Sequence, residues 1–156
     1  MTRSTAPSSL VTRIEHTALT QSSITFVGSA AGDLDTDSLT WQSLYFDARR
    51  YAAALADRGV RAGAHVAILG PTTRPLVTTI EATWISGAAA VMLPLPMRLA
   101  SIDEFVLATR TRLLQSDSVL FLIDDQLADF IDEQPGDPNV MRLSELATTA
   151  QHLLSD

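Results

Sequence analysis

The sequence predicts an α/β domain built on a mainly parallel sheet with helices on both faces. Three features lead to this prediction: an apolar run at 65–69, a helical pattern that Gly87 closes, and a second apolar run at 88–93. A strand, a helix and a strand joined by short turns form a βαβ unit with parallel strands and a right-handed crossover. The second run does not alternate, so we expect a strand that is covered on both faces.

Composition limits the classes of protein that the chain can belong to. Its 156 residues are 46% hydrophobic and 19% charged, which is typical of one globular domain. The net charge of -7 argues against a nucleic-acid partner. The absence of cysteine excludes disulfides, thiolate metal sites and a cysteine nucleophile. With neither a signal-length apolar core nor an apolar stretch of about 20 residues, we expect a soluble, cytoplasmic protein without a membrane span.

The N-terminal part reads as an arm followed by a hairpin. Residues 1–23 are polar and weakly patterned, so we expect an arm lying over a domain that occupies 24–156. A short strand is predicted at 24–27, a loop at 28–37, and a return strand that pairs Leu39 with the first strand. Three alternating aspartates in that loop could suggest a calcium site, but the glycine and the distal glutamate of a calcium loop are missing, so a solvated turn is favoured: Asp33, Asp35 and Asp37.

A helix should follow from Trp41, with Thr40 as its N-cap and Gly59 just past its end. Its apolar positions fall on one face: Leu44, Ala48, Tyr51, Ala52 and Leu55. In the helix of the βαβ unit the predicted buried stripe is Leu76, Val77, Ile80 and Trp84. Glu81 lies beside that stripe, and we expect an exposed or capping carboxylate there in preference to a catalytic one.

The second half of the chain completes a βαβαβ core preceded by the hairpin and helix. Ser101 and Glu104 form a capping box. A third apolar strand is predicted at 119–123, a short helix at 126–133 and a last strand at 140–143. Ser144 should cap a terminal helix that runs to about residue 154. The inward face of the helix after Ser101 is predicted to be Ile102, Phe105, Val106, Thr109 and Leu113.

A search for chemistry finds no complete motif. The turn at 70–74 is not Gly-x-Gly-x-x-Gly, and Pro71 removes a backbone donor where a phosphate would bind. All eleven basic residues are arginine, so no Walker lysine exists. Gly-x-Ser-x-Gly is also absent.

Three histidines and two aspartates are the remaining candidates. The histidines are too scattered to suggest a metal site, and His65 reads as structural: His16, His65 and His152. Asp124 and Asp125 end a strand at the edge where ligands bind in open sheets, although acidic turns are common there. We therefore assign no catalytic, cofactor-binding or metal-binding residue in this chain.

Several short segments occur in an order and spacing that matches one family. They are Ile24-Thr25-Phe26-Val27; Ser38-Leu39-Thr40-Trp41 with Leu44; Ala48, Ala52, Leu55 and Gly59-Val60; Gly63-x-x-Val66-Ala67-Ile68-Leu69; and Gly87-Ala88 leading through Val91 to Pro94-Leu95-Pro96. On these segments residues 24–124 resemble the N-terminal subdomain of adenylate-forming enzymes, the fatty-acyl-CoA synthetases and, more closely, the fatty-acyl-AMP ligases. Ala64 departs from the aspartate usual in the family.

The resemblance implies a two-step reaction in a longer parent enzyme. ATP, with magnesium, and a fatty acid give an acyl-adenylate, and the acyl group then passes to the thiol of coenzyme A or of a carrier protein. The family's phosphate loop, its adenine and ribose motifs and its C-terminal lysine are missing here. The resemblance thus implies an N-terminal fragment that is inactive alone and whose partner is the remainder of the ligase. It further implies exposed apolar surface, through which dimers could form.

Two other classes of protein remain open from the sequence. One is a free-standing, non-catalytic α/β module that binds a partner protein. The other is a small nucleotide- or acyl-binding protein that uses the strand-end crevice near Pro94, where Arg98 could meet an anionic group, although a surface or ion-paired arginine is the commoner role.

Overall fold

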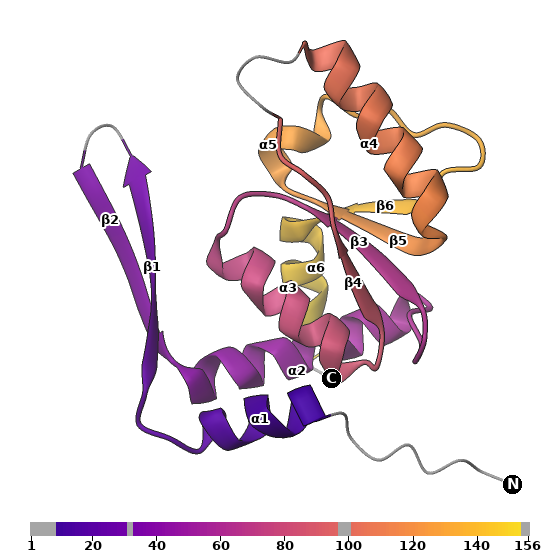
Figure 1. Cartoon of the computed structure of the whole chain (residues 1–156). Helices are drawn as coiled ribbons and strands as arrows, with labels where there is room; N and C mark the ends of the chain where they lie inside the picture. The colour runs from indigo at the N-terminus through magenta and orange to yellow at the C-terminus, as the bar shows by residue number, and fades with distance from the viewer. Residues whose placement is uncertain (1–8, 31–32, 97–100, 154–156) are drawn as a thin grey trace, which may run out of the picture.

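The computed structural model describes residues 9–30, 33–96 and 101–153, which form an α/β fold with a separate hairpin (Figure 1). The elements, in chain order, are α1 (Ser9–Ala18), β1 (Ser23–Ala30), β2 (Asp33–Thr40), α2 (Trp41–Asp57), β3 (His65–Leu69), α3 (Arg74–Ile85), β4 (Ala89–Met92), α4 (Ile102–Ser116), β5 (Ser118–Ile123), α5 (Asp125–Ala128), β6 (Asn139–Arg142) and α6 (Leu143–His152).

The main sheet is parallel, with the strand order β4-β3-β5-β6. Alternate residues of the central strand β3 enter two separate cores. Val66 and Ile68 pack in the core that includes α2, α3 and α6, whereas Ala67 and Leu69 pack in the core that includes α4. Figure 1 shows these helices on opposite faces of the sheet. The prediction of a parallel sheet with helices on both faces is confirmed.

Strand β4 differs from its prediction. It lies at the edge of the sheet and pairs only with β3 among the described strands. Ala89 and Met92 are exposed and Ala90 and Val91 are half-buried, so the strand is not covered on both faces. An unbroken apolar run without alternation predicts a central strand. The run itself, however, does not show whether a second strand lies beside it, and here only β3 does among the described strands. One edge of β4 is therefore available for pairing.

The hairpin of β1 and β2 is longer than predicted. The pairing of Ile24 with Leu39 is confirmed, but the strands extend through residues 28–30 and 33–37, where a loop was predicted. The antiparallel ladder overrides the weak strand preference of Gly and Asp, because strand propensity depends strongly on context. The three alternating aspartates thus belong to a strand rather than to a calcium loop, and residues 31–32 lie outside the described residues.

A helix, α1, lies within residues 1–23, which were predicted to be a weakly patterned arm. It packs along α2, and the Tyr45 hydroxyl donates a hydrogen bond to Glu15 Oε1 at 3.2 Å. The signal that was missed is the spacing of Val11, Ile14 and Ala18 on one helical face. The division into an arm at 1–23 and a domain at 24–156 stays a prediction.

The ends of α2 and the start of α4 agree with the sequence. The Thr40 side chain accepts from Ser43 N at 3.1 Å, and Gly59 has a φ of +87° just past the end of α2. Ser101 and Glu104 form the predicted capping box. Ile102, however, is 58% exposed, so its predicted inward position was wrong. The first turn of α4 extends beyond the sheet that its later turns cover (Figure 1).

Two helices near the C-terminus also differ from expectation. The predicted helix at 126–133 is the single turn α5, and α6 begins at Leu143, one residue before the predicted cap. Ser144 does not cap α6, because its hydroxyl and its backbone N–H both donate to the carboxylate of Asp125. These bonds tie the start of α6 to α5.

Candidate functional site

Open parallel sheets usually bind ligands where the strand order reverses, in the crevice beyond the carboxyl ends of the strands. Here that point lies between β3 and β5, since the chain runs from β3 to β4 on one side and later to β5 on the other. Gly70 follows β3 at this point, and a Cβ added to it would lie 3.0 Å from Asp124 Cβ and 3.0 Å from Leu76 Cδ1. The side chains of Asp124 and Leu76 therefore pack closely against Gly70, and even a methyl group at this position would crowd them.

The two aspartates that end β5 are held by internal hydrogen bonds. Asp124 accepts from Gln126 N at 3.0 Å and so caps α5, and Asp125 accepts from Ser144. Arg142 Nη1 donates to the backbone oxygen of Asp125 at 3.1 Å. Their position at the carboxyl end of the strand is as predicted, and their carboxylates serve the connections to α5 and α6.

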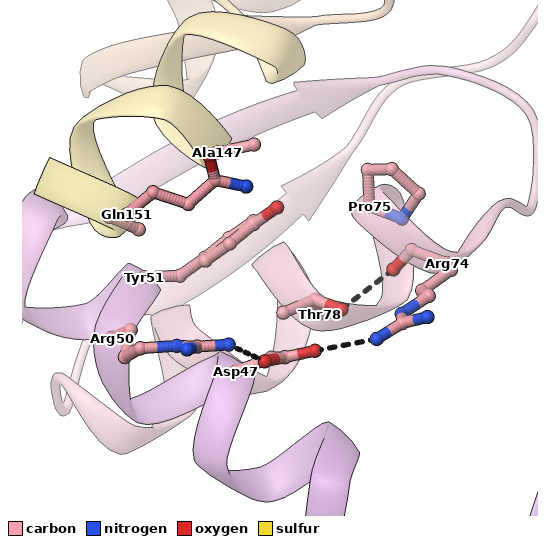
Figure 2. Close-up of a pocket in the computed structure, with 9 residues that line it drawn as sticks. Asp47, Arg50, Tyr51, Arg74, Pro75, Thr78, Ala147 and Gln151 are labelled. Carbon is pink, nitrogen blue, oxygen red and sulfur yellow. Dashed lines mark hydrogen bonds and ion pairs between the residues drawn. The ribbon is translucent and has the colours of Figure 1, made fainter. Parts of the chain in front are cut away.

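The described part of the chain has a more open pocket between α2, α3 and α6 (Figure 2). Its volume is about 240 Å³. These three helices are far apart in the sequence and pack together on one face of the sheet. The pocket is lined by Asp47, Arg50, Tyr51, Arg74, Pro75, Thr78, Ala147, Ala150 and Gln151.

Asp47 is the electrostatic centre of this pocket. Its carboxylate, 16% exposed, lies between two guanidinium groups: it pairs with Arg50 on α2, and with Arg74 on α3 at 2.9 Å (Figure 2). Arg74 also reaches Asp37 in the hairpin at 3.5 Å. Two carboxylates thus neutralise two guanidinium groups, and this network joins α2, α3 and the hairpin. Its first role is structural.

The remaining polar groups of the pocket are neutral. Burial is the main cause that raises the pKa of Tyr51, so its hydroxyl is protonated at neutral pH. Within the described residues this hydroxyl makes no hydrogen bond, whereas the Thr78 hydroxyl donates to the backbone oxygen of Arg74 at 2.8 Å. Gln151 adds an amide from α6. The pocket can hold a polar group by hydrogen bonds, but it has no nucleophile beside a base.

Glu81 is the most unusual ionisable group in the described part of the chain. It is 5% exposed, and its Oε2 atom has no hydrogen-bond partner among the residues that the structure describes. Burial raises the pKa of Glu81 to about 7. The prediction of an exposed or capping carboxylate was wrong. Burying this group without a cation favours its protonated form.

The burial of Glu81 was missed because α3 buries a different face from the one predicted. Threonines take much of the place of the predicted apolar stripe: Thr78, Thr79 and Thr83 are buried, whereas Val77 and Trp84 are half-buried. The hydroxyls of Thr79 and Thr83 each donate to the backbone oxygen four residues earlier at 2.8 Å, so their burial leaves no unpaired donor. Helix periodicity counted over apolar residues alone misses such a face, and Glu81 lies on it.

The other residues weighed from the sequence do not form a site. The three histidines lie on α1, β3 and α6, and His65 Nδ1 contacts the backbone oxygen of Ser116 at 2.7 Å. No group of three or more His, Asp or Glu side chains in the described ranges is arranged to hold a metal ion. In the same ranges, no helix has the length and apolar character needed to cross a bilayer. Arg98 lies outside the described residues.

Comparison with known proteins agrees with this architecture. The model of the AMP-binding enzyme family matches residues 13–149, which is most of the chain. The chain therefore belongs to the AMP-binding enzyme family, and the resemblance drawn from its short segments is confirmed. No curated protein sequence matches the chain.

Solved structures with the same fold are several times longer than this chain. A structure from a study of fatty acyl-adenylate ligases of E. coli and L. pneumophila matches 89% of this chain and 25% of its own, with a TM-score of 0.79 and 20% identity. Fatty acid AMP ligase from Legionella pneumophila matches 92% and 25%, with a TM-score of 0.70 and 18% identity. O-succinylbenzoate coenzyme A synthetase from Bacillus subtilis matches 72% and 27%, with a TM-score of 0.56 and 24% identity. The chain thus spans about a quarter of the length of these enzymes.

Proposed function

We propose that this chain is the N-terminal part of an ATP-dependent ligase that activates fatty acids. The observation that carries the proposal is the family match over residues 13–149, together with the similarity in fold to fatty acyl-adenylate ligases. In the proposed reaction the fatty-acid carboxylate attacks the α-phosphorus of ATP, forming acyl-adenylate and releasing pyrophosphate. The acyl group then passes to a thiol, of coenzyme A or of a carrier protein, and AMP leaves. We place the parent enzyme in the cytoplasm.

The chemistry is assigned to the remainder of the parent ligase. Transfer of the adenylyl group develops charge that must be stabilised, and cationic side chains and magnesium are the usual means. This chain contains no lysine, and the guanidinium groups of Arg50 and Arg74 are paired with carboxylates. ATP and magnesium are accordingly proposed as cofactors of the parent, and the 156-residue chain is proposed to be inactive alone.

In this proposal the chain supplies a scaffold on which other parts of the ligase pack. The free edge of β4 is the clearest place for such packing, because its outer side has no strand partner within the described residues and Met92 is exposed beside it. A strand from the rest of the ligase can pair there through backbone hydrogen bonds. Residues 24–156 act as the N-terminal subdomain, and residues 1–23 act as an arm.

Pyrophosphate release tests the proposal. The purified chain is incubated with ATP, magnesium and fatty acids of several chain lengths, and pyrophosphate is measured with and without each acid. We expect no release above the ATP blank, and we expect acid-dependent release when the longer parent enzyme replaces the fragment. Acid-dependent release from the fragment would overturn its assignment as inactive, and none from the parent would overturn the proposed reaction.

A further inference from the structure

One long face of α2 is left uncovered by the rest of the described chain. Leu44, Ala48 and Leu55 are buried on the core side of this helix. The opposite side, with the spacing i, i+3, i+7, i+10 and i+11, carries exposed side chains: Phe46, Arg49, Ala53, Ala56 and Asp57. Phe46 is 54% exposed, which is unusual for a phenylalanine.

A shallow groove runs along this face of α2. It has a volume of about 420 Å³ and lies between α2 and the C-terminal end of α6, from which Ala150 and Leu153 contribute. Phe46 and Ala53 supply apolar side chains from α2, and Leu153 is itself partly exposed. An aromatic side chain beside an arginine, on a groove with apolar walls, is the composition typical of a protein interface.

The charged side chains on this face, Arg49 and Asp57, form no ion pairs within the described residues, unlike Arg50 elsewhere on α2. Arg50 is held by Asp47, whereas Arg49 makes no ion pair within the described residues and lies over the Tyr45 ring at 5.9 Å. Asp57 likewise has no ion pair there. Eight residues separate Arg49 and Asp57, so about 12 Å of helix axis lies between a free guanidinium and a free carboxylate.

Two arginines near the end of α2, Arg58 and Arg61, form no ion pair with the Asp57 carboxylate within the described residues. Arg61 donates to the backbone oxygens of Ala56, at 2.5 Å, and Val60, at 2.8 Å. Arg58 lines a separate hollow that Ser144 and Glu145 also line. Asp57 is the carboxylate that the exposed face of α2 presents.

We propose that two copies of this chain pair through this face, with their α2 helices antiparallel. The N-terminal half of the face is large and cationic, with Phe46 and Arg49. Its C-terminal half is small and anionic, with Ala53, Ala56 and Asp57. An antiparallel pair brings unlike halves together twice. In the register that places Phe46 opposite Ala56 of the second copy, Arg49 lies opposite Ala53 of that copy. The long Arg49 side chain leans toward the N-terminus of its own helix and so reaches Asp57 of the second copy, about 6 Å further along the helix axis.

This self-complementarity is the argument for a second copy as the occupant. A two-fold contact uses one patch twice, so each favourable pairing is duplicated. The contact is limited to one helix face and Leu153, and the net charge of -7 on each chain opposes association. The dimer should therefore be weak and dependent on concentration. The proposal does not rest on ligase activity.

Sedimentation equilibrium tests the proposal directly. The unaltered chain should show a monomer–dimer equilibrium. Phe46→Glu should weaken dimerisation at least about tenfold, by placing a carboxylate on the alanines. Arg49→Asp and Asp57→Arg should each weaken it about as much, since each creates two like-charge contacts. An equimolar mixture of these two variants should dimerise again, because each contact then joins a carboxylate to a guanidinium.

Leu107→Glu is the matched control. Leu107 is an exposed leucine on α4, on the other face of the sheet, so this change should leave the dimer intact. Circular dichroism establishes that every variant is folded. The proposal is overturned if the unaltered chain is monomeric at all concentrations, if Leu107→Glu weakens the dimer as much as Phe46→Glu does, or if the mixture of charge variants fails to dimerise.

Discussion

Two buried or largely buried carboxyl groups lie on neighbouring helices, Asp47 on α2 and Glu81 on α3, and their surroundings differ. Asp47 is largely buried but lies between two guanidinium groups. Glu81 is more deeply buried, has an oxygen without a hydrogen-bond partner in the described ranges, and has a pKa raised to about 7 by burial. The difference shows that burial alone does not decide the charge of a carboxyl group. The available partners matter as well, because a cationic partner favours the charged form of a carboxyl group whereas burial without a partner favours its protonated form.

The largest expected effect concerns Glu81 and pH. The pKa of Glu81 is about 7 in the folded chain against an ordinary value of 4.5, so between these values the folded state keeps a proton that the unfolded state releases. The free energy of unfolding should therefore fall as pH rises from about 4.5 to about 7, by roughly 3 kcal/mol from this group. Urea unfolding at several pH values measures it.

Glu81→Gln is the matched variant for that measurement. Its amide does not titrate, so the fall in stability between pH 5 and pH 8 should shrink by most of the roughly 3 kcal/mol assigned to Glu81. An unchanged pH dependence in this variant would show that Glu81 is not the group responsible, and would remove the contrast with Asp47.

A smaller effect is expected at Asp47. Asp47→Asn keeps the shape of the side chain but leaves Arg50 and Arg74 without their shared carboxylate, and should lower the free energy of unfolding by about 1–2 kcal/mol. Asp57→Asn is the control on the same helix, because Asp57 has no ion pair within the described residues. Measured at a concentration where the chain is monomeric, it should change stability by less than about 0.5 kcal/mol. Equal losses from both variants would contradict a specific role for Asp47.

The smallest effect is expected at Tyr51. Its hydroxyl lines the same pocket as Asp47 but makes no hydrogen bond within the described residues. Tyr51→Phe should therefore alter the free energy of unfolding by less than about 0.5 kcal/mol in urea titration. A decrease in the free energy of unfolding above about 1 kcal/mol would mean that the Tyr51 hydroxyl does make a stabilising hydrogen bond.

The parts of the fold that the sequence predicts well depend on local rules. Thr40, Gly59 and the capping box at Ser101 are recognisable because each needs only neighbouring residues. The face of α3 was mispredicted because a threonine can be buried once its hydroxyl bonds the preceding turn, and an apolar count does not register this. The exposure of β4 depends on which strand lies beside it, which its own residues do not encode.

The candidate pocket could not be predicted from spacing. Its residues come from α2, α3 and α6, and only packing on one face of the sheet brings Asp47, Arg74 and Gln151 together. The strand-end aspartates were a reasonable expectation from topology. Their carboxylates accept hydrogen bonds at the starts of α5 and α6, which agrees with the turn that the sequence favoured there. The family, by contrast, is recognisable from the order of short segments that build the sheet and its turns.

The most direct test of the central claim is the reading frame beyond the codon for Asp156 in the natural gene. The proposal of a longer parent ligase predicts that the frame continues, since this chain spans about a quarter of the length of the ligase structures that it resembles. Under this proposal it should run into the Ser/Thr/Gly-rich phosphate loop ending in lysine that the resemblance to adenylate-forming enzymes implies. A stop codon immediately after Asp156 would contradict the proposal that the protein is part of a fatty-acid-activating ligase.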